Sequence, residues 1–438
     1  MNQHLPEQRL PKAVRGEGIF VYDDQGKQYL DGSGGPALFC LGHSNREVVD
    51  AIKKQYDSIE FAYSTTFTSD VIDELSELLV GLAGGDLKHV SYVSGGSEAA
   101  DTAMKVALQY QLAKGYSGRT HFIARRQSWH GYTIGALSLS GHPARRMPYT
   151  GSLLPVTHVS PANVYRPPIG MDASNLAQCL ADELEQTIQR LGAEKVAAFF
   201  MEPVVGAAGG AVPAPDGYTK LVKDICHRYG VLLVADEVMC GVGRCGTWRA
   251  MQADDVEPDI MYTAKGLAGG YAPIGAVLMS SPVFEQITRC FGRFASVHTY
   301  SGHTVACAAA VAVQKIIVRE SLVARCESEG QYIKFRLREM LGDEPHVGDI
   351  RGRGLFLAFE IVKDKQTKVP FDPALHIADR FRSIAFANGL ICYPSAGTVD
   401  GFNGDHVLIS PPYNITRSET DLMLDLLVQA YRDLMSVI

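Results

Sequence analysis

A lysine set among small residues is the first feature of the sequence that could carry out chemistry. Lys265 lies in the stretch YTAKGLAGGYAPIGAV, residues 262–277, and is followed by several glycines. Small neighbours allow a flat, bulky partner to approach the backbone, and partial burial lowers the pKa of a lysine amine. A desolvated lysine is suited to Schiff-base chemistry, although a lysine packed for structural reasons would leave the same pattern.

A carboxylate ends a short apolar segment upstream of this lysine. Residues 231–238 read VLLVADEV, which predicts a buried parallel strand with Asp236 at its carboxyl end. Ligand sites in open α/β sheets lie at that edge, although an acid there can also cap a following helix. Asp236 and Lys265 are separated by roughly 30 residues, the length of one βαβ unit, so neighbouring strands could bring them to one crevice. A carboxylate for a pyridinium nitrogen and a lysine for an imine are the two groups that pyridoxal phosphate requires.

A turn of small residues offers a place for a phosphate group. Gly96 and Ser97 follow a predicted strand that ends at Ser94, and they open a predicted amphipathic helix. Backbone N–H groups, the helix dipole and a hydroxyl make such a turn an anion site. A simple capping turn with Ser97 as N-cap would use the same residues. The sequence contains no Walker A motif, and residues 241–246 fit GxGxxG without a convincing helix after them.

The elements around these groups alternate between strands and helices. Strands are predicted at HFIARR, which precedes Trp129, and at VAAFFM, which precedes Glu202; a helix over residues 217–229 leads to the Asp236 strand. This alternation predicts an α/β fold with a doubly wound, mostly parallel sheet. Trp129 could stack on a cofactor ring or could simply pack against its neighbours.

The two ends of the chain have a different pattern. A β-hairpin over residues 18–32 precedes a glycine-rich loop that carries Leu38 and Phe39, which could pack locally or line a substrate pocket. The C-terminal part alternates differently and indicates a smaller α+β domain. We therefore predict an N-terminal part of a small domain at residues 1–65, a large domain at 66–318 and the rest of the small domain at 319–438. Helices are predicted at residues 46–58, 71–82, 175–191, 306–317, 377–388 and from 418.

Composition limits the classes of partner. A chain of 438 residues is long enough for two domains, and a net charge of −7 disfavours nucleic acid and anionic membranes. The 9 cysteines are an odd number, and the N-terminus MNQHLPEQRLPK has no signal-peptide pattern, so we expect reduced thiols and a cytoplasmic protein. Cys240 and Cys245 lack the spacing of a zinc site, and no metal site is predicted. No apolar run is long enough to span a membrane.

Six segments, taken together, carry a resemblance to a known family. SGGSEA, SWHG, MEPVVGAAGG, VADEV, TAKGLAGG and HTYSGHTVA occur in order over nearly the whole chain and resemble the class III aminotransferases of pyridoxal-phosphate fold type I. The resemblance implies a homodimer with shared active sites. It also implies these cofactor contacts: Lys265 for the imine, Asp236 for the ring nitrogen, Val238 and Trp129 for the two ring faces, Gly96 and Ser97 for the phosphate, Glu202 near the ring substituents, and Thr299 for the phosphate bound by the partner subunit.

The sequence departs from those family members that use 2-oxoglutarate. Such members often carry a glutamate after the EP pair and an arginine before the C-terminal PP pair, where this chain has Ala207 and Leu408. The small Ala207 resembles the amine:pyruvate (ω-transaminase) and diaminopelargonate branches. We expect transfer from a primary amine or ω-amino acid to an α-keto acid, with pyruvate favoured, by a ping-pong mechanism. The expected substrate pocket consists of Leu38, Phe39, Tyr63, Trp129 and Ala207. The sequence does not identify the partner of the acceptor carboxylate. Arg145, Arg146 and Arg166 are candidates because they lie in predicted loops, although solvated or structural arginines would lie there too.

Other functions would use the same residues. Lys265 and Asp236 would also serve an aminomutase, a decarboxylase or a racemase. A non-catalytic pyridoxal-phosphate-binding module of a regulator is a further alternative, which the negative charge and the absence of a basic DNA-binding segment disfavour. Only a transaminase would convert the bound cofactor with an amine and restore it with a keto acid.

Overall fold

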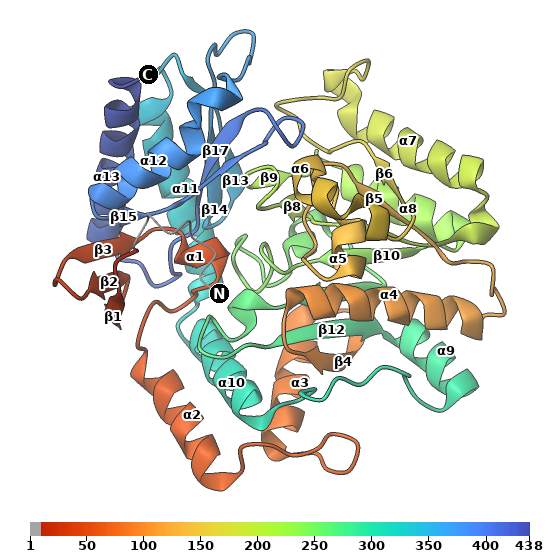
Figure 1. Ribbon diagram of the computed structural model, residues 1–438. Coiled ribbons are helices and arrows are strands. Elements are labelled where there is room, and N and C mark those ends of the chain that lie inside the picture. The colour runs from red at the N-terminus through yellow and green to blue at the C-terminus, as the bar shows by residue number, and fades with distance from the viewer. Residues whose placement is uncertain (1–9) are drawn as a thin grey trace.

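A seven-stranded sheet forms the centre of the protein in the computed structural model, which describes residues 10–438 (Figure 1). The strand order is β4-β12-β11-β10-β7-β5-β6. Strand β12 pairs antiparallel with both of its neighbours, and the other six strands are parallel to one another. The strands are β4 (Leu87–Val93), β5 (His121–Arg125), β6 (Val156–Val159), β7 (Val196–Met201), β10 (Leu232–Asp236), β11 (Ile260–Thr263) and β12 (Gly275–Ser280).

Both faces of this sheet are covered by helices, which explains the uninterrupted apolar sequence of its central strands. Every residue of β7 and β10 is buried. One face packs against α4 (Gly96–Ala113), α5 (Ile134–Leu139) and α9 (Ser281–Phe291). The opposite face packs against α3 (Asp70–Ala83), α7 (Leu176–Leu191), α8 (Tyr218–Tyr229) and α10 (Thr304–Arg319). The predicted doubly wound, mostly parallel sheet is therefore confirmed.

Segments from the two ends of the chain lie side by side (Figure 1). The predicted hairpin is formed by β2 (Phe20–Asp23) and β3 (Gln28–Asp31), with β1 (Ala13–Glu17) beside it. Strand β3 pairs in parallel with β15 (Leu390–Ile391), which lies some 360 residues later in the chain. A second sheet has the order β13-β14-β17-β16, from β13 (Val347–Arg353), β14 (Phe356–Ile361), β16 (Tyr393–Ala396) and β17 (Asp405–Ile409). The domain limits at residues 65 and 318 stay a prediction.

Several helices match their predicted bounds closely, and other elements were missed. Helix α2 (Arg46–Ser58) agrees at both ends, α12 (Ile377–Ala387) ends one residue early, and α13 (Arg417–Met435) begins one residue before the prediction. Helix α11 (Leu322–Leu341) was not predicted. The reversed direction of β12 was also missed, because its sequence GAVLMS is as apolar as that of its parallel neighbours and carries no sign of direction.

Within residues 10–438, no helix is long and apolar enough to cross a membrane. The polar segment at residues 1–9, which includes most of the N-terminal pattern discussed above, lies outside the described residues. Cys240 and Cys245 are buried in the core, as their interpretation as packing residues requires.

Candidate active site

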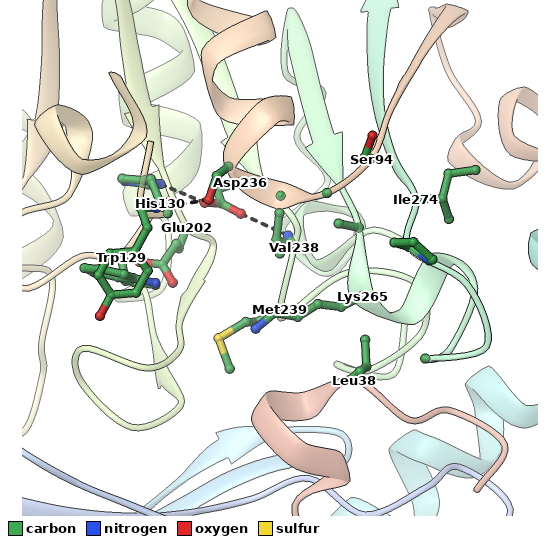
Figure 2. A pocket seen from close by; sticks show the side chains of 18 of the residues that line it. Leu38, Ser94, Trp129, His130, Glu202, Asp236, Val238, Met239, Lys265 and Ile274 are labelled. Carbon is green, nitrogen blue, oxygen red and sulfur yellow. Dashed lines mark hydrogen bonds and ion pairs between the residues drawn. The ribbon is translucent and has the colours of Figure 1, made fainter. Parts of the chain in front are cut away.

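A cavity of about 480 Å³ lies at the carboxyl ends of the parallel strands (Figure 2). Loops that follow β4, β5, β7, β10 and β11 all contribute to its walls, because the strands run in the same direction. The predicted site residues among its lining residues are Leu38, Gly96, Ser97, Trp129, Glu202, Asp236, Val238 and Lys265. The structure thus brings residues from six separate segments to one place.

Asp236, the last residue of β10, is held by three donors. Its Oδ1 accepts a hydrogen bond from the backbone N–H of Val238 at 2.9 Å. Its Oδ2 lies 2.7 Å from Nδ1 of His130 and accepts the hydroxyl of Tyr262 at 2.8 Å. All three side chains of this Asp236–His130–Tyr262 cluster are buried, and burial raises the pKa of Tyr262 well above its usual range. The carboxylate is therefore fixed in orientation before any ligand arrives.

Lys265 follows β11 in a strained backbone conformation. Its φ of 41° lies in the left-handed region, which is costly for a residue with a side chain and is found mainly where the surroundings impose it. The Nζ atom donates to the carbonyl of Pro36 at 2.9 Å. Burial lowers the pKa of this amine to about 8, although Asp236 and Glu202 counteract part of the effect. A useful fraction of the amine is therefore unprotonated near neutral pH.

Glu202 lies just beyond β7 and orders the opposite wall. Its two carboxylate oxygens accept backbone N–H groups of Trp129 and Gly206, each at 2.9 Å. Burial raises the pKa of this carboxyl group. In Figure 2 the side chains of Glu202 and Trp129 lie next to each other on the His130 side of the cavity. Glu202 therefore positions the Trp129 loop.

The phosphate end of the predicted site is the N-terminus of α4. The helix begins at Gly96, shortly after β4, so the amides of its first turn have no intrahelical partner, and both Gly96 and Ser97 line the cavity. The hydroxyl of Ser97 accepts the backbone N–H of Tyr132 at 3.0 Å. Gly131, with a φ of 135°, approaches Ser97 so closely that a side chain at Gly131 would collide with it.

Four predicted residues do not line the cavity of the single chain. Phe39 packs beside Gly270 at its edge, and Tyr63 and Thr299 are exposed in loops. Ala207 is buried in a small apolar cluster that also contains Leu408 and contacts Trp129. The roles predicted for these four residues, and for those that do line the cavity, stay predictions.

Two residues of the site were missed as functional candidates. In the sequence, His130 stands out only as the neighbour of Trp129, and Tyr262 only as the first residue of the stretch that contains Lys265. They are 106 and 26 residues from Asp236 in sequence, and only the pairing of β10 with β11 and the fold of the loop after β5 bring them together. One signal could have indicated Tyr262 as a hydrogen-bond partner of Asp236: it is a tyrosine in a buried strand next to the strand that ends in this carboxylate.

The chain's own groups fit pyridoxal phosphate. A buried, fixed carboxylate suits a ring nitrogen, an amine with a pKa of about 8 suits the aldehyde carbon, and a helix N-terminus suits the phosphate. Trp129 and Val238 supply flat and branched apolar surfaces for a ring.

Comparisons with known proteins agree with this geometry. Residues 5–431 match the protein family described as class-III aminotransferases. An uncharacterized aminotransferase of Schizosaccharomyces pombe (strain 972) is 42% identical over 424 residues, which cover 96% of this chain and 92% of that protein. A taurine–pyruvate aminotransferase of Bilophila wadsworthia is 34% identical over 93% of this chain and 89% of that protein. The omega transaminase from Pseudomonas jessenii, solved in complex with PMP, has a TM-score of 0.91 and 33% identity and covers 100% of this chain and 97% of its own.

The chain therefore belongs to the class-III aminotransferases. It is a pyridoxal-phosphate-dependent enzyme that catalyses transamination. The expected α/β fold of type I is confirmed.

The predicted roles of the residues follow from their chemistry. When bound, pyridoxal phosphate supplies the carbonyl that receives the amino group and a ring that accepts the electrons released at the donor carbon. Asp236 can accept a hydrogen bond from the ring nitrogen and stabilise a positive charge there. Lys265 can take a proton from the donor carbon as a free amine and return it as an ammonium group. Because the pKa of Lys265 is about 8, both states are accessible near neutral pH.

Proposed function

We propose that the enzyme transfers an amino group from a primary amine or an ω-amino acid to an α-keto acid, with pyruvate as the favoured acceptor. The observation that carries this proposal is the apolar cluster around Ala207 and Leu408, which packs against Trp129 beside the cavity. Neither position offers a charge that could receive and then release the second carboxylate of 2-oxoglutarate, and burying an unpaired carboxylate is costly. The taurine–pyruvate aminotransferase among the relatives supports pyruvate.

The same proposal includes a ping-pong mechanism and a cytoplasmic location. One amine of Lys265 serves both half-reactions, so the donor product leaves before the acceptor binds. The nine free cysteines among the described residues suit a reducing compartment.

A homodimer with shared active sites is also part of the proposal. The loop at residues 59–69 and the loop at 292–303 lie together, because the ring centroids of Phe61 and Tyr300 are 6.2 Å apart. The hydroxyl of Thr304, at the start of α10, also donates to the carbonyl of Ile59. Both loops expose large apolar side chains, namely Ile59, Tyr63, Phe67, Val297 and Tyr300. An exposed apolar patch of this kind is typical of a protein interface, and Thr299 lies within it.

A spectroscopic half-reaction assay tests the substrate proposal. The loaded enzyme should lose the absorbance of its aldehyde form with a small aryl or alkyl amine, or with a β- or γ-amino acid. Pyruvate should then restore that absorbance with a higher kcat/KM than 2-oxoglutarate. A preference for glutamate with 2-oxoglutarate would contradict the proposal.

Complementation tests the shared site. In a shared site, Lys265 comes from one subunit and Thr299 from the other. Lys265→Ala removes the lysine, and Thr299→Glu places a carboxylate against the cofactor phosphate bound by the partner subunit, so each variant alone should be inactive. A mixture of the two inactive proteins should regain activity, because one site of each heterodimer is then intact. A fully active monomer, or no recovery after proven subunit exchange, would contradict the shared site.

A further inference from the structure

We infer that Arg145 is the residue that binds the carboxylate of the keto-acid acceptor. This inference rests on the proposed use of a keto acid. Three arginines were left open by the sequence, and the structure separates them. Arg166 is paired with Glu360 at 2.6 Å, and Nη1 of Arg146 is directed to backbone carbonyls and to His158 away from the cavity.

Arg145, in the short helix α6 (Pro143–Arg146), lies behind the cavity wall and contacts two residues of the predicted substrate pocket, Trp129 and Ala207. Its guanidinium carbon lies 4.7 Å from the ring centroid of Trp129, which lines the cavity. Its Nη2 donates to the carbonyl of Ala207 at 3.1 Å and to the hydroxyl of Ser395 at 3.2 Å. The cation is therefore held beside the backbone of Ala207, the position at which the sequence lacks the glutamate of the members that use 2-oxoglutarate.

The charge of Arg145 is not neutralised by the protein. Within residues 10–438, no carboxylate forms an ion pair with it, and its known hydrogen bonds involve Nη2 alone. Nη1 and Nε remain available to a ligand, and a guanidinium group presents these donors in the geometry that a carboxylate requires. Trp129 and Ser395 fix the plane of the group, which reduces the entropy lost when an anion binds.

Two buried histidines near Arg145 add no charge of their own. His142 and His406 are buried nearby, and ring nitrogens of both lack a partner among the described residues. Burial, followed by the charge of Arg145, lowers the pKa of His142 to about 4, and burial with Arg351 and Arg145 lowers that of His406 well below its usual value. Both imidazoles are therefore neutral at physiological pH, so the positive charge beside Trp129 comes from Arg145.

The role of Arg145 differs from simple support of Trp129 in one measurable way. A carboxylate ligand matters only for acceptors that have a carboxylate, whereas support of Trp129 matters for every substrate and for the cofactor. The test compares pyruvate with propanal, a small acceptor that lacks the carboxylate, using Arg145→Gln and Arg145→Lys in the loaded enzyme. Arg126→Gln is the matched control, because Arg126 lies nearby but faces Ser160 and Glu183 instead of the site.

Arg145→Gln should raise the KM for pyruvate about 10- to 100-fold, the range of one lost charge-assisted interaction, and should change kcat/KM for propanal by less than about 2-fold. Arg145→Lys keeps the charge and should recover part of the loss. Calorimetric titration with propionate gives a readout without turnover: binding should be lost in Arg145→Gln and kept in Arg126→Gln.

Equal losses for pyruvate and propanal, or unchanged propionate binding in Arg145→Gln, would overturn the role of Arg145. A wild-type enzyme that accepts no keto acid would instead overturn the proposed function. If Arg145→Gln does not fold, Arg145→Lys provides the test. A partial rise in KM for pyruvate alone would support carboxylate binding by Arg145, and an equal loss of kcat/KM for pyruvate and propanal would contradict it.

Discussion

The inner and outer walls of the cavity differ in how their charged groups are partnered. On the inner wall, each oxygen of Asp236 and of Glu202 accepts at least one hydrogen bond from the protein. On the outer wall, Trp129 lines the cavity, and behind it Arg145 lies against the indole ring without a carboxylate partner among the described residues. Groups that serve every turnover are fixed in advance, whereas a group that selects a substrate keeps donors available for it.

Loss of the amine of Lys265 should have the largest effect on activity. Lys265→Ala removes the group that moves the proton, so kcat should fall by about 10⁴-fold or more. Steady-state kinetics with the preferred pair measures this loss. Lys223→Ala removes an ion pair with Asp259 elsewhere and should retain activity. A Lys265→Ala protein with substantial turnover would remove the lysine from the mechanism.

Loss of the negative charge of Asp236 should have the second largest effect on activity. Asp236→Asn keeps the size of the side chain but cannot stabilise a positive ring nitrogen as a carboxylate does, so kcat/KM should fall by about 10²- to 10³-fold. Circular dichroism and the melting temperature should show a folded protein. A variant that turns over near the wild-type rate would mean that Asp236 does not face the ring nitrogen.

Removal of one of the donors to Asp236 should have a smaller effect. Tyr262→Phe deletes the 2.8 Å hydrogen bond to Oδ2, while His130 still holds the carboxylate, so kcat/KM should fall by about 5- to 10-fold. Tyr92→Phe, which deletes a buried hydroxyl that bonds Ser76 outside the site, is the matched control. An equal effect in both variants would show a loss of general stability and not of carboxylate positioning.

The pH dependence of stability should be the smallest effect. Burial lowers the pKa of Lys265 to about 8 in the folded protein from 10.5. Between these values the unfolded chain binds more protons, so the free energy of unfolding rises with pH. A shift of this size corresponds to at most about 3 kcal/mol, and partial exposure of the amine reduces the expected gain of the cofactor-free wild type over Lys265→Met to on the order of 1 kcal/mol. Urea unfolding at pH values near 7.5 and 10 measures the difference; no change would mean that the amine is not desolvated.

The predictable part of the site consists of residues at strand ends. Asp236, Lys265 and Gly96 follow apolar segments with clear boundaries, and the alternation of strands and helices fixes the edge of the sheet at which they meet. The contacts of His130 and Arg145 were not predictable, because each depends on how a loop folds against a wall built from distant segments. Arg145 reaches Ala207, 62 residues away, and Ser395, 250 residues away, and no periodic pattern records such contacts.

The attachment of the cofactor to Lys265 is the central claim, and one measurement tests it directly. The loaded enzyme is reduced with borohydride, digested and mapped by mass spectrometry. The pyridoxyl group should be found on the peptide that contains Lys265, and Lys265 should be unmodified in unreduced controls. A pyridoxyl group on any other lysine, with Lys265 unmodified, would contradict the assignment of the site.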